Sequence, residues 1–111
     1  MSTDRLCYLN GRFLPMSQAH VPVLDRGFIF GDGIYEVVPV YGRRLFRFNE
    51  HMARLERSLD RIRIPNPHSR DEWLQRCRRL VAALADAEGS LDQVIYLQVT
   101  RGVAPRDHVM P

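Results

Sequence analysis

Arg106 and His108, near the end of the chain, have the residue types and the spacing that suit carboxylate binding. In an extended segment, residues two apart face the same way, because successive side chains alternate in direction. A guanidinium fork donates two hydrogen bonds to a carboxylate, and an imidazole can donate a third. The pattern predicts a pair that binds an anion, although two solvated side chains on an exposed loop would have the same sequence.

Arg54 is a second candidate for anion binding, since a guanidinium can clamp two phosphate oxygens at once. Arg57 and Arg61 follow at three and seven residues and share approximately the same side of a helix. The three arginines could therefore form a solvated stripe instead, and helical periodicity alone favours the stripe.

The sixteen basic residues other than histidine are all arginine, so the chain contains no lysine. It therefore has no ε-amine to act as a nucleophile or a base. A metal centre is not indicated either, because two cysteines cannot complete a zinc site and the histidines lack metal-ligand spacing. We assign no catalytic residue and no metal ligand. The cysteines and histidines considered are Cys7, Cys77, His20, His51 and His68.

Length and composition are those of a single soluble domain. The 111 residues are 45% apolar and 26% charged, which is ordinary for a globular protein. No stretch approaches the roughly 20 apolar residues of a membrane span, and the N-terminus lacks a signal-peptide pattern. Acids interrupt the arginine-rich stretches, which disfavours a nucleic-acid-binding face despite the net charge of +3. We expect a cytoplasmic protein with reduced cysteines and with neither membrane nor nucleic-acid partners.

The start of the chain predicts short strands. Residues 6–9 and 12–14 flank Asn10-Gly11, a dipeptide that favours a tight hairpin turn. Residues 21–25 are expected to form a further short strand.

A longer strand is expected in the next segment. Gly31-Asp32-Gly33 breaks regular structure before a strand over residues 34–41. Gly42-Arg43 then turns the chain into another strand over residues 45–48. Pro39 donates no ladder hydrogen bond, so an edge position or a bulge is expected there.

The middle of the chain predicts an amphipathic helix of about 14 residues, with Asn49 as its N-cap. Apolar residues recur at three and four residues on one face and the segment 65–67, with two prolines, follows the helix. The residues on the apolar face are Met52, Leu55, Leu59 and Ile62.

A second helix is predicted to follow. Ser69 and Glu72 form a capping-box pattern at its start, and Gly89 is suited to its C-terminal cap. Its predicted apolar stripe consists of Leu74, Cys77, Val81 and Leu84.

Residues 93–100 alternate in a way typical of a strand, and residues 102–111 are expected to form a loop. Strands therefore precede two helices, and one strand follows them. This order predicts an α+β fold, in which an antiparallel sheet has two helices packed on one face.

Two sequence motifs resemble one enzyme family. Residues 25–36 and residues 98–108 are similar to the D-amino-acid aminotransferases, within the class IV, fold-type IV group of pyridoxal-phosphate enzymes. Residues 49–55 resemble the phosphate-arginine motif of that family. The resemblance extends from about Leu6 to Pro111, and the Arg-x-His pattern favours the D-amino-acid branch.

The resemblance implies roles for particular residues. Arg54 would bind the phosphate of pyridoxal 5'-phosphate. Tyr35 and Val37, on one side of a strand, would face the cofactor and the substrate. Arg106 and His108 would bind the substrate carboxylate.

The resemblance also implies what the whole enzyme does. Residues 1–111 would be the small N-terminal domain, and the catalytic lysine would lie in a C-terminal domain that this chain does not include. The parent enzyme would exchange amino groups between a D-amino acid, such as D-alanine, and a 2-oxo acid. It would be a homodimer, because the loop with Arg106 reaches the neighbouring active site in this family. The 111 residues alone are expected to be inactive.

Two other functions remain open. Within the same family, the reaction would be that of an aminodeoxychorismate lyase or of a branched-chain aminotransferase. In a different class, the chain would be a non-catalytic interaction module or a nucleic-acid-binding module, with binding that weakens steeply as salt rises.

Overall fold

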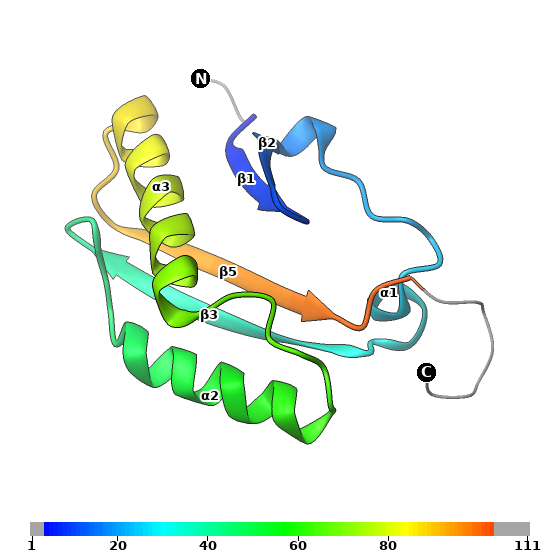
Figure 1. Ribbon diagram of the computed structural model, residues 1–111. Coiled ribbons are helices and arrows are strands. Elements are labelled where there is room, and N and C mark those ends of the chain that lie inside the picture. Colours follow the sequence, from blue (N-terminus) through cyan, green and yellow to red (C-terminus); the bar gives the residue numbers. More distant parts are fainter. Residues whose placement is uncertain (1–3, 104–111) are drawn as a thin grey trace.

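The computed structural model describes residues 4–103, which form two sheets and four helical segments (Figure 1). The strands are β1 (Leu6–Leu9), β2 (Arg12–Pro15), β3 (Gly33–Tyr41), β4 (Arg44–Leu45) and β5 (Gln93–Thr100). The helical segments are the 3-10 turn η1 (Met16–Gln18) and the helices α1 (Arg26–Phe30), α2 (Phe48–Arg61) and α3 (Arg70–Glu88). The predicted α+β fold is confirmed.

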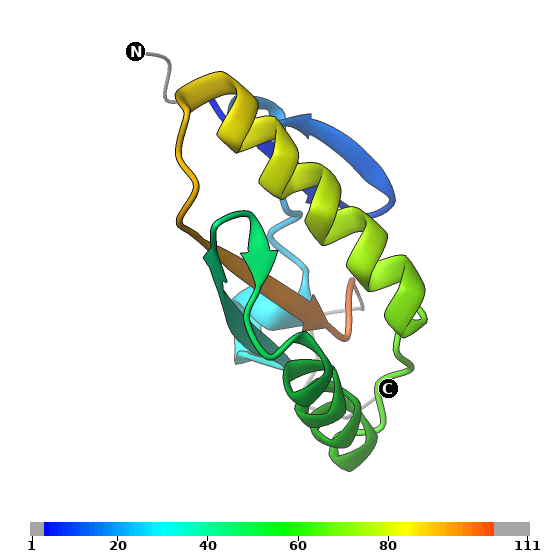
Figure 2. The same cartoon turned by 90° about the vertical axis from the view of Figure 1, so that its left-hand side faces the viewer.

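Three strands form an antiparallel sheet in the order β4-β3-β5, and α2 and α3 both lie on one face of it (Figures 1 and 2). The predicted hairpin is present as β1 and β2, but it forms a sheet of its own instead of joining the larger one. It contacts α3, where Arg79 lies over the Phe13 ring at 4.0 Å from its centroid. The hairpin therefore lies against α3 and outside the three-stranded sheet (Figure 1).

The core lies between the three-stranded sheet and the two helices. Inward-facing residues of β3 and β5, such as Val38 and Leu97, pack against apolar residues of α2. Met52, Leu55 and Leu59 of α2 are 0–1% exposed, and burial of each contributes roughly 1.5–3 kcal/mol. The apolar spacing that predicted this helix therefore identified its buried face correctly.

The buried stripe of α3 differs in part from the prediction. Cys77 and Val81 are buried as expected, but Leu74 is only half-buried, and so is Leu84. Trp73 and Ala85 take their places, because α3 crosses the sheet along a row of residues four apart. The indole N–H of Trp73 donates to Asn66 Oδ1 at 2.9 Å, which satisfies its polar atom in the core.

Two local predictions between β3 and α2 are corrected. The strand expected over residues 45–48 is limited to Arg44–Leu45, and α2 already begins at Phe48. Its N-cap is Arg47 in a left-handed conformation (φ 54°), not Asn49. This early start turns the Phe48 side chain toward the core, where it packs as a partly buried residue.

Pro39 lies in the central strand without a bulge, since the register between β3 and β5 is continuous on both sides of it. Its carbonyl faces β4 and accepts the N–H of Phe46 at 2.8 Å. In an antiparallel sheet, the backbone nitrogen and oxygen of one residue face the same neighbouring strand. The nitrogen of Pro39, which carries no hydrogen, therefore faces the side where β4 ends. Of the two alternatives expected for Pro39, the bulge is wrong. The strand is central, but β4 is so short that the nitrogen of Pro39 faces an edge of β3 without a strand partner among the described residues.

The strand expected over residues 21–25 is also wrong. Asp25 is instead the N-cap of α1, and its carboxylate accepts the N–H of Gly27 at 2.8 Å. Its backbone N–H donates to Pro22 at 3.0 Å, which closes a turn before the helix.

The second face of the three-stranded sheet carries exposed apolar side chains from both long strands. Tyr35, Val37 and Tyr41 project from β3, and Val94 and Tyr96 project from β5. Each is at least 40% exposed. In the described part of the chain, this open face therefore lies opposite the two helices that cover the sheet.

Candidate functional site

Arg54 projects from α2 and forms a bidentate ion pair with Glu36 of β3. Arg54 Nε lies 2.9 Å from Glu36 Oε2, and Nη2 lies 2.9 Å from Oε1. This fork-to-carboxylate geometry fixes the plane of the guanidinium. Arg54, the phosphate-binding candidate of the sequence analysis, is therefore held in one orientation by Glu36. The motif had assigned no such role to Glu36.

Glu36 is 5% exposed and depends on its partners to remain ionised. Burial raises the pKa of its carboxyl group, but hydrogen bonds from Arg54 and from His51 Nδ1, at 2.8 Å, outweigh this effect. The pKa of Glu36 is consequently lowered. The same carboxylate raises the pKa of Arg54, so both members of the pair are charged near neutral pH.

Arg54 retains capacity to bind a second anion. Its side chain is 59% exposed, although that of Glu36 is only 6% exposed. Glu36 uses Nε and Nη2, and within residues 4–103 Nη1 makes no hydrogen bond. The donor set therefore fits a phosphate that approaches from solvent. Arg57 and Arg61 are also exposed, and among residues 4–103 neither forms an ion pair with a buried carboxylate.

Tyr35 and Val37 project from the open face of the sheet, as the alternation of a strand requires. The Tyr35 ring stacks on the Tyr96 ring, with centroids 5.4 Å apart and planes 18° apart. The Tyr96 hydroxyl donates to Gln98 Oε1 at 3.3 Å. Tyr96 and Gln98 of β5 thus position Tyr35. Their role follows only from the register of the two strands, in which Tyr35 pairs with Gln98.

Tyr35 and Arg54 lie on different sides of β3, because Arg54 is bonded to Glu36, and Glu36 faces the helices. β4 pairs only with Val40 and Tyr41. The same edge of β3 has no strand partner from Gly33 to Val38 among the described residues. A ligand that contacts both Tyr35 and Arg54 therefore has to lie at this edge.

Asp32 joins two buried arginines at the other end of the sheet. Its Oδ2 accepts from Arg26 Nε at 2.9 Å and from Arg101 Nε at 2.8 Å. The hydrogen bond from Arg101 is the main reason that the pKa of Asp32 is lowered, and Arg26 acts in the same direction against the effect of burial. The side chains are only 8–12% exposed, so the carboxylate neutralises charges that are largely removed from water.

The Asp32 cluster also fixes the backbone where β5 ends. Arg101 Nη2 donates to the carbonyl of Ile62, after α2, at 2.6 Å. The N–H of Arg26 donates to the carbonyl of Gly102 at 2.8 Å, and Asp25 forms an isolated bridge with Val103. The backbone is therefore held at Gly102 and Val103. Arg106 and His108 follow in the sequence and lie outside the described residues.

The glycines of the 25–36 motif allow close packing at this point. A Cβ on Gly33 would lie 2.6 Å from the carbonyl oxygen of Val99, and one on Gly27 would overlap the Thr100 side chain. Gly31 ends α1 with φ 65°. The sequence identified Gly31-Asp32-Gly33 as a break in regular structure but missed α1, which has only five residues.

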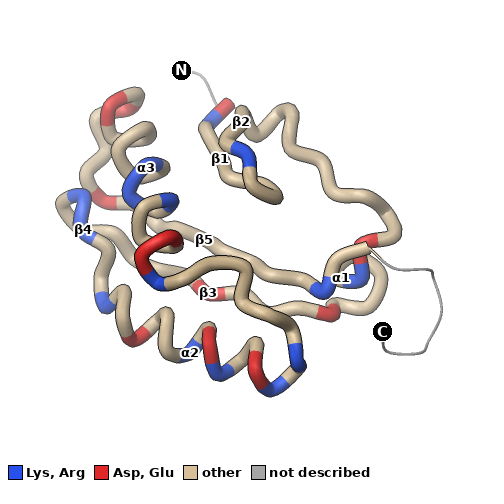
Figure 3. The backbone as a smooth tube through the Cα atoms, viewed as in Figure 1, with Lys and Arg blue, Asp and Glu red and all other residues tan. Residues whose placement is uncertain are grey.

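Acidic and basic residues are mixed along α2 and α3 (Figure 3). Several arginines pair with acids, as Arg5 does with Glu88 and Arg70 with Glu56. No helix in the described part of the chain is long and apolar enough to span a membrane. The same residues contain no cluster of three or more potential metal ligands from His, Cys, Asp and Glu.

A family model for amino-transferase class IV matches residues 33–111, which include Tyr35, Glu36 and Arg54. The chain belongs to the class IV aminotransferases. Curated relatives agree with this assignment. The D-alanine aminotransferase of Staphylococcus aureus (strain MSSA476) is 43% identical over 104 residues, which cover 94% of this chain and 36% of that protein. The D-alanine aminotransferase of Listeria monocytogenes (strain F2365) is 42% identical over 104 residues, with 93% and 35% covered. The chain thus spans about a third of the length of these relatives.

Solved structures share the fold. A 4-amino-4-deoxychorismate lyase from Pseudomonas aeruginosa is 35% identical, with a TM-score of 0.64 over 84% of this chain and 32% of its own. A branched-chain amino acid aminotransferase from Escherichia coli is 24% identical, with a TM-score of 0.77 over 92% and 35%. A hypothetical aminotransferase from Mycobacterium tuberculosis in a PLP-bound form is 20% identical, with a TM-score of 0.79 over 90% and 35%. The last two similarities establish the fold alone.

We expect Asp32→Asn to lower the free energy of unfolding by about 3 kcal/mol, because it leaves two buried guanidinium groups without their counter-charge. The folded state lowers the pKa of Asp32 from its usual value of 3.8. The carboxylate therefore stabilises the fold at pH values above 3.8, and this stabilisation is lost as the pH falls through the lowered pKa. Urea titrations near pH 7 measure the loss, with exposed Asp60→Asn as the control. A loss no larger than that of Asp60→Asn would contradict a structural role for the cluster.

A second prediction compares two ion pairs of similar geometry. Glu36→Gln should cost about 1–3 kcal/mol near pH 7, because it weakens a buried charge-assisted network. Glu56→Gln disrupts the exposed pair with Arg70 and should cost less than about 1 kcal/mol.

The pKa of Glu36 is lowered from 4.5, so its contribution should be present above that pH and fade as pH falls below it. Urea denaturation of both variants across this range measures the difference. If Glu36→Gln and Glu56→Gln lowered the free energy of unfolding equally at every pH, burial would not make the Glu36–Arg54 pair more stabilising than the exposed pair.

Proposed function

We propose that residues 1–111 form the small N-terminal domain of a pyridoxal-phosphate-dependent aminotransferase that acts on D-amino acids. The similarity to D-alanine aminotransferases along 94% of the chain carries this proposal. The geometry of Arg54 supports it, because a largely exposed guanidinium with a fixed orientation suits a phosphate group.

Pyridoxal phosphate, when bound, supplies the electron-withdrawing ring through which an amino group passes between a D-amino acid, such as D-alanine, and a 2-oxo acid. Arg54 binds its phosphate through the N–H groups that Glu36 does not use. Because Glu36 orders the arginine beforehand, little side-chain freedom is lost when the phosphate binds. Glu36 is therefore a positioning residue for Arg54.

Tyr35 and Val37 contact the substrate from the open face of the sheet, and Arg106 and His108 donate hydrogen bonds to its carboxylate. A carboxylate held in one place fixes which face of the substrate Cα meets the base that moves its proton. The chain contains no lysine, so we place that base in a further, C-terminal domain. Residues 1–111 alone should then not turn over substrate.

We further propose that the whole protein is a cytoplasmic homodimer, in which the segment after β5 reaches the active site of the neighbouring subunit. The contacts beside the Asp32 cluster support this arrangement, because they hold the backbone at Gly102 and Val103, immediately before that segment in the sequence. Arg106 and His108 would then serve a substrate that contacts Tyr35 of the other subunit.

A second candidate function is that of an aminodeoxychorismate lyase. The 35% identity to the lyase from Pseudomonas aeruginosa favours it specifically. Both reactions would use the same phosphate contact at Arg54, so the two functions differ in the substrate and not in this part of the site. The branched-chain aminotransferase from Escherichia coli is only 24% identical, and that similarity supports only the fold.

An assay of the full-length protein with D-alanine, L-leucine and aminodeoxychorismate separates these functions. We expect kcat/KM for D-alanine, with a 2-oxo acid as acceptor, to exceed that for L-leucine by at least about tenfold, the effect of roughly 1.4 kcal/mol in transition-state binding. Isolated residues 1–111 should be inactive under the same conditions. Turnover of aminodeoxychorismate alone would establish the lyase instead, and preference for L-leucine would contradict both.

Arg54→Gln in the full-length protein should weaken the binding of pyridoxal phosphate by about tenfold to a hundredfold, because charge-assisted hydrogen bonds are lost. Arg57→Gln, three residues away on the same helix, is the control and should bind normally. Equilibrium dialysis against the cofactor measures both. Equal affinities for the two variants and the unaltered protein would remove Arg54 from the cofactor site.

A further inference from the structure

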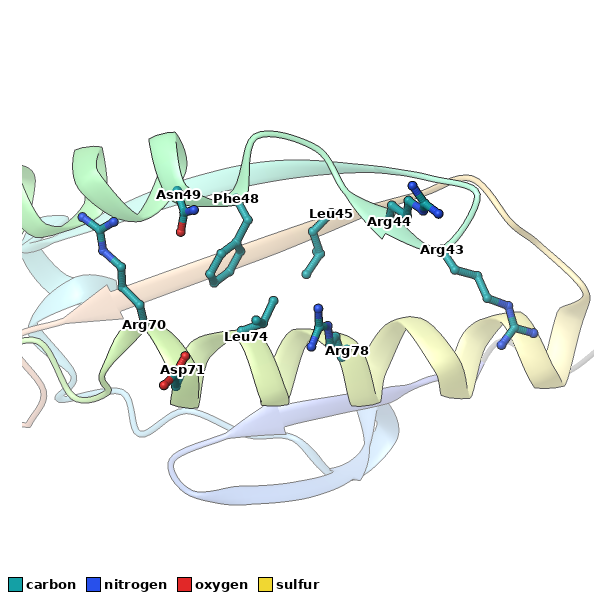
Figure 4. A pocket seen from close by; sticks show the side chains of 9 residues that line it. All are labelled: Arg43, Arg44, Leu45, Phe48, Asn49, Arg70, Asp71, Leu74 and Arg78. Carbon is teal, nitrogen blue, oxygen red and sulfur yellow. The ribbon is translucent and has the colours of Figure 1, made fainter.

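Three polar side chains meet between α2 and β3. Glu36 projects from β3, and His51 and Arg54 are three residues apart on α2, a spacing that places them on the same side of the helix. The first turn of α2 also borders an open hollow beside α3, which Phe48 and Asn49 line (Figure 4). Glu36, His51 and Arg54 do not line that hollow, so they form a separate cluster.

His51 and Arg54 share one oxygen of the Glu36 carboxylate. His51 Nδ1 lies 2.8 Å from Glu36 Oε1, and Arg54 Nη2 lies 2.9 Å from the same atom. Arg54 Nε binds the other oxygen, Oε2, at 2.9 Å. The side chains of Glu36 and His51 are only 6% and 15% exposed. Water therefore has little access to replace the imidazole as a donor to the carboxylate.

The contact assigns a hydrogen to one nitrogen of the imidazole. Burial raises the pKa of Glu36, but the hydrogen bonds from Arg54 and His51 outweigh burial and lower it. Glu36 is then an ionised carboxylate, which only accepts hydrogen bonds, so His51 Nδ1 carries the hydrogen and donates it. Arg54 Nη2 lies 3.4 Å from His51 Nδ1, and because both nitrogens are donors, they bind Oε1 side by side and not each other.

The second donor fixes a torsion that Arg54 alone leaves soft. The last torsion of a glutamate side chain has a broad distribution, so a carboxylate and a guanidinium paired with it can rotate together. His51 approaches Oε1 separately from Arg54 and opposes this rotation. Because a paired guanidinium lies in the plane of its carboxylate, the imidazole also sets the direction of the N–H groups that Arg54 has free.

We propose that His51 is a positioning residue for cofactor binding, because its Nδ1–H holds the Glu36 carboxylate in the plane that directs Arg54 toward the phosphate. The inference rests on the proposed function, since it takes Arg54 as the phosphate contact. His51 acts through Glu36 and does not have to touch the cofactor. The site therefore requires a hydrogen-bond donor at the position of Nδ1, and not a complete imidazole ring.

The test compares the binding of pyridoxal phosphate with that of pyridoxal, which lacks the phosphate, to the full-length protein freed of cofactor. His51→Leu should weaken pyridoxal phosphate by about tenfold, because Arg54 loses its fixed orientation toward the phosphate. The affinity for pyridoxal should change by less than about twofold. Equal losses for the two ligands would overturn the proposal, because His51 would then support the fold and not the phosphate contact.

His51→Asn tests whether the donor itself matters. An asparagine amide nitrogen lies close to the position of imidazole Nδ1 and also donates, so this variant should bind pyridoxal phosphate within about threefold of the unaltered protein. If asparagine does not restore what leucine loses, the ring or its outer nitrogen is required, and the proposal fails. His51→Ala measures the same loss without added bulk if the leucine variant does not fold. His20→Asn, at an exposed histidine, is the control and should bind normally.

Arg54→Gln, measured alongside, separates this inference from the proposed function. If Arg54→Gln weakens pyridoxal phosphate and His51→Leu does not, Arg54 remains the phosphate contact and the role of His51 is refuted. If neither variant weakens it, the phosphate contact at Arg54 is refuted together with the role of His51.

Discussion

The carboxylate of Asp32, shared by Arg26 and Arg101, is the interaction on which the rest of the structure depends. Two guanidinium groups that are about nine-tenths buried would be costly without this counter-charge. Through Arg101 the cluster reaches the carbonyl that follows α2, and through Arg26 it holds the backbone beyond β5. One carboxylate thus ties α1, both long strands and α2 together at a single end of the sheet.

Beyond this end of the sheet, successive side chains of β3 face opposite sides and have different roles. Glu36 faces the helices, where it stays ionised in the core and orients Arg54. Its neighbour Tyr35 faces outward onto a sheet surface that retains exposed tyrosine and valine side chains. Exposed apolar patches of this kind are typical of surfaces that bind a ligand or another protein surface. The covered face therefore stabilises the domain, and the edge and open face remain available for chemistry.

The elements that the sequence predicted correctly depend on local patterns. The apolar spacing of α2, the reciprocal capping of Ser69 and Glu72, and the alternation of β5 are each contained in one segment. The errors arose where an element is too short to show a pattern or where its start has no local signal. The helix α1 is too short for a periodic signal, and α2 begins after Arg47 in a left-handed conformation that no local pattern specified.

The candidate site follows the same rule. Arg54 and Tyr35 were identified from motifs, but the motifs did not indicate that Glu36 orients Arg54 across 18 residues of sequence. The stacking of Tyr35 on Tyr96 follows from the register between β3 and β5, which no pattern within either strand specifies. Sequence therefore identified residue types that could bind ligands, and tertiary structure supplied the partners that orient them.

The most direct test is a crystal structure of the full-length protein with pyridoxal phosphate bound. We expect Arg54 to contact the phosphate while it keeps its ion pair with Glu36, at the free edge of β3, with Tyr35 beside the substrate space. A cofactor phosphate bound by other residues, with Arg54 paired to Glu36 alone, would contradict the proposed site.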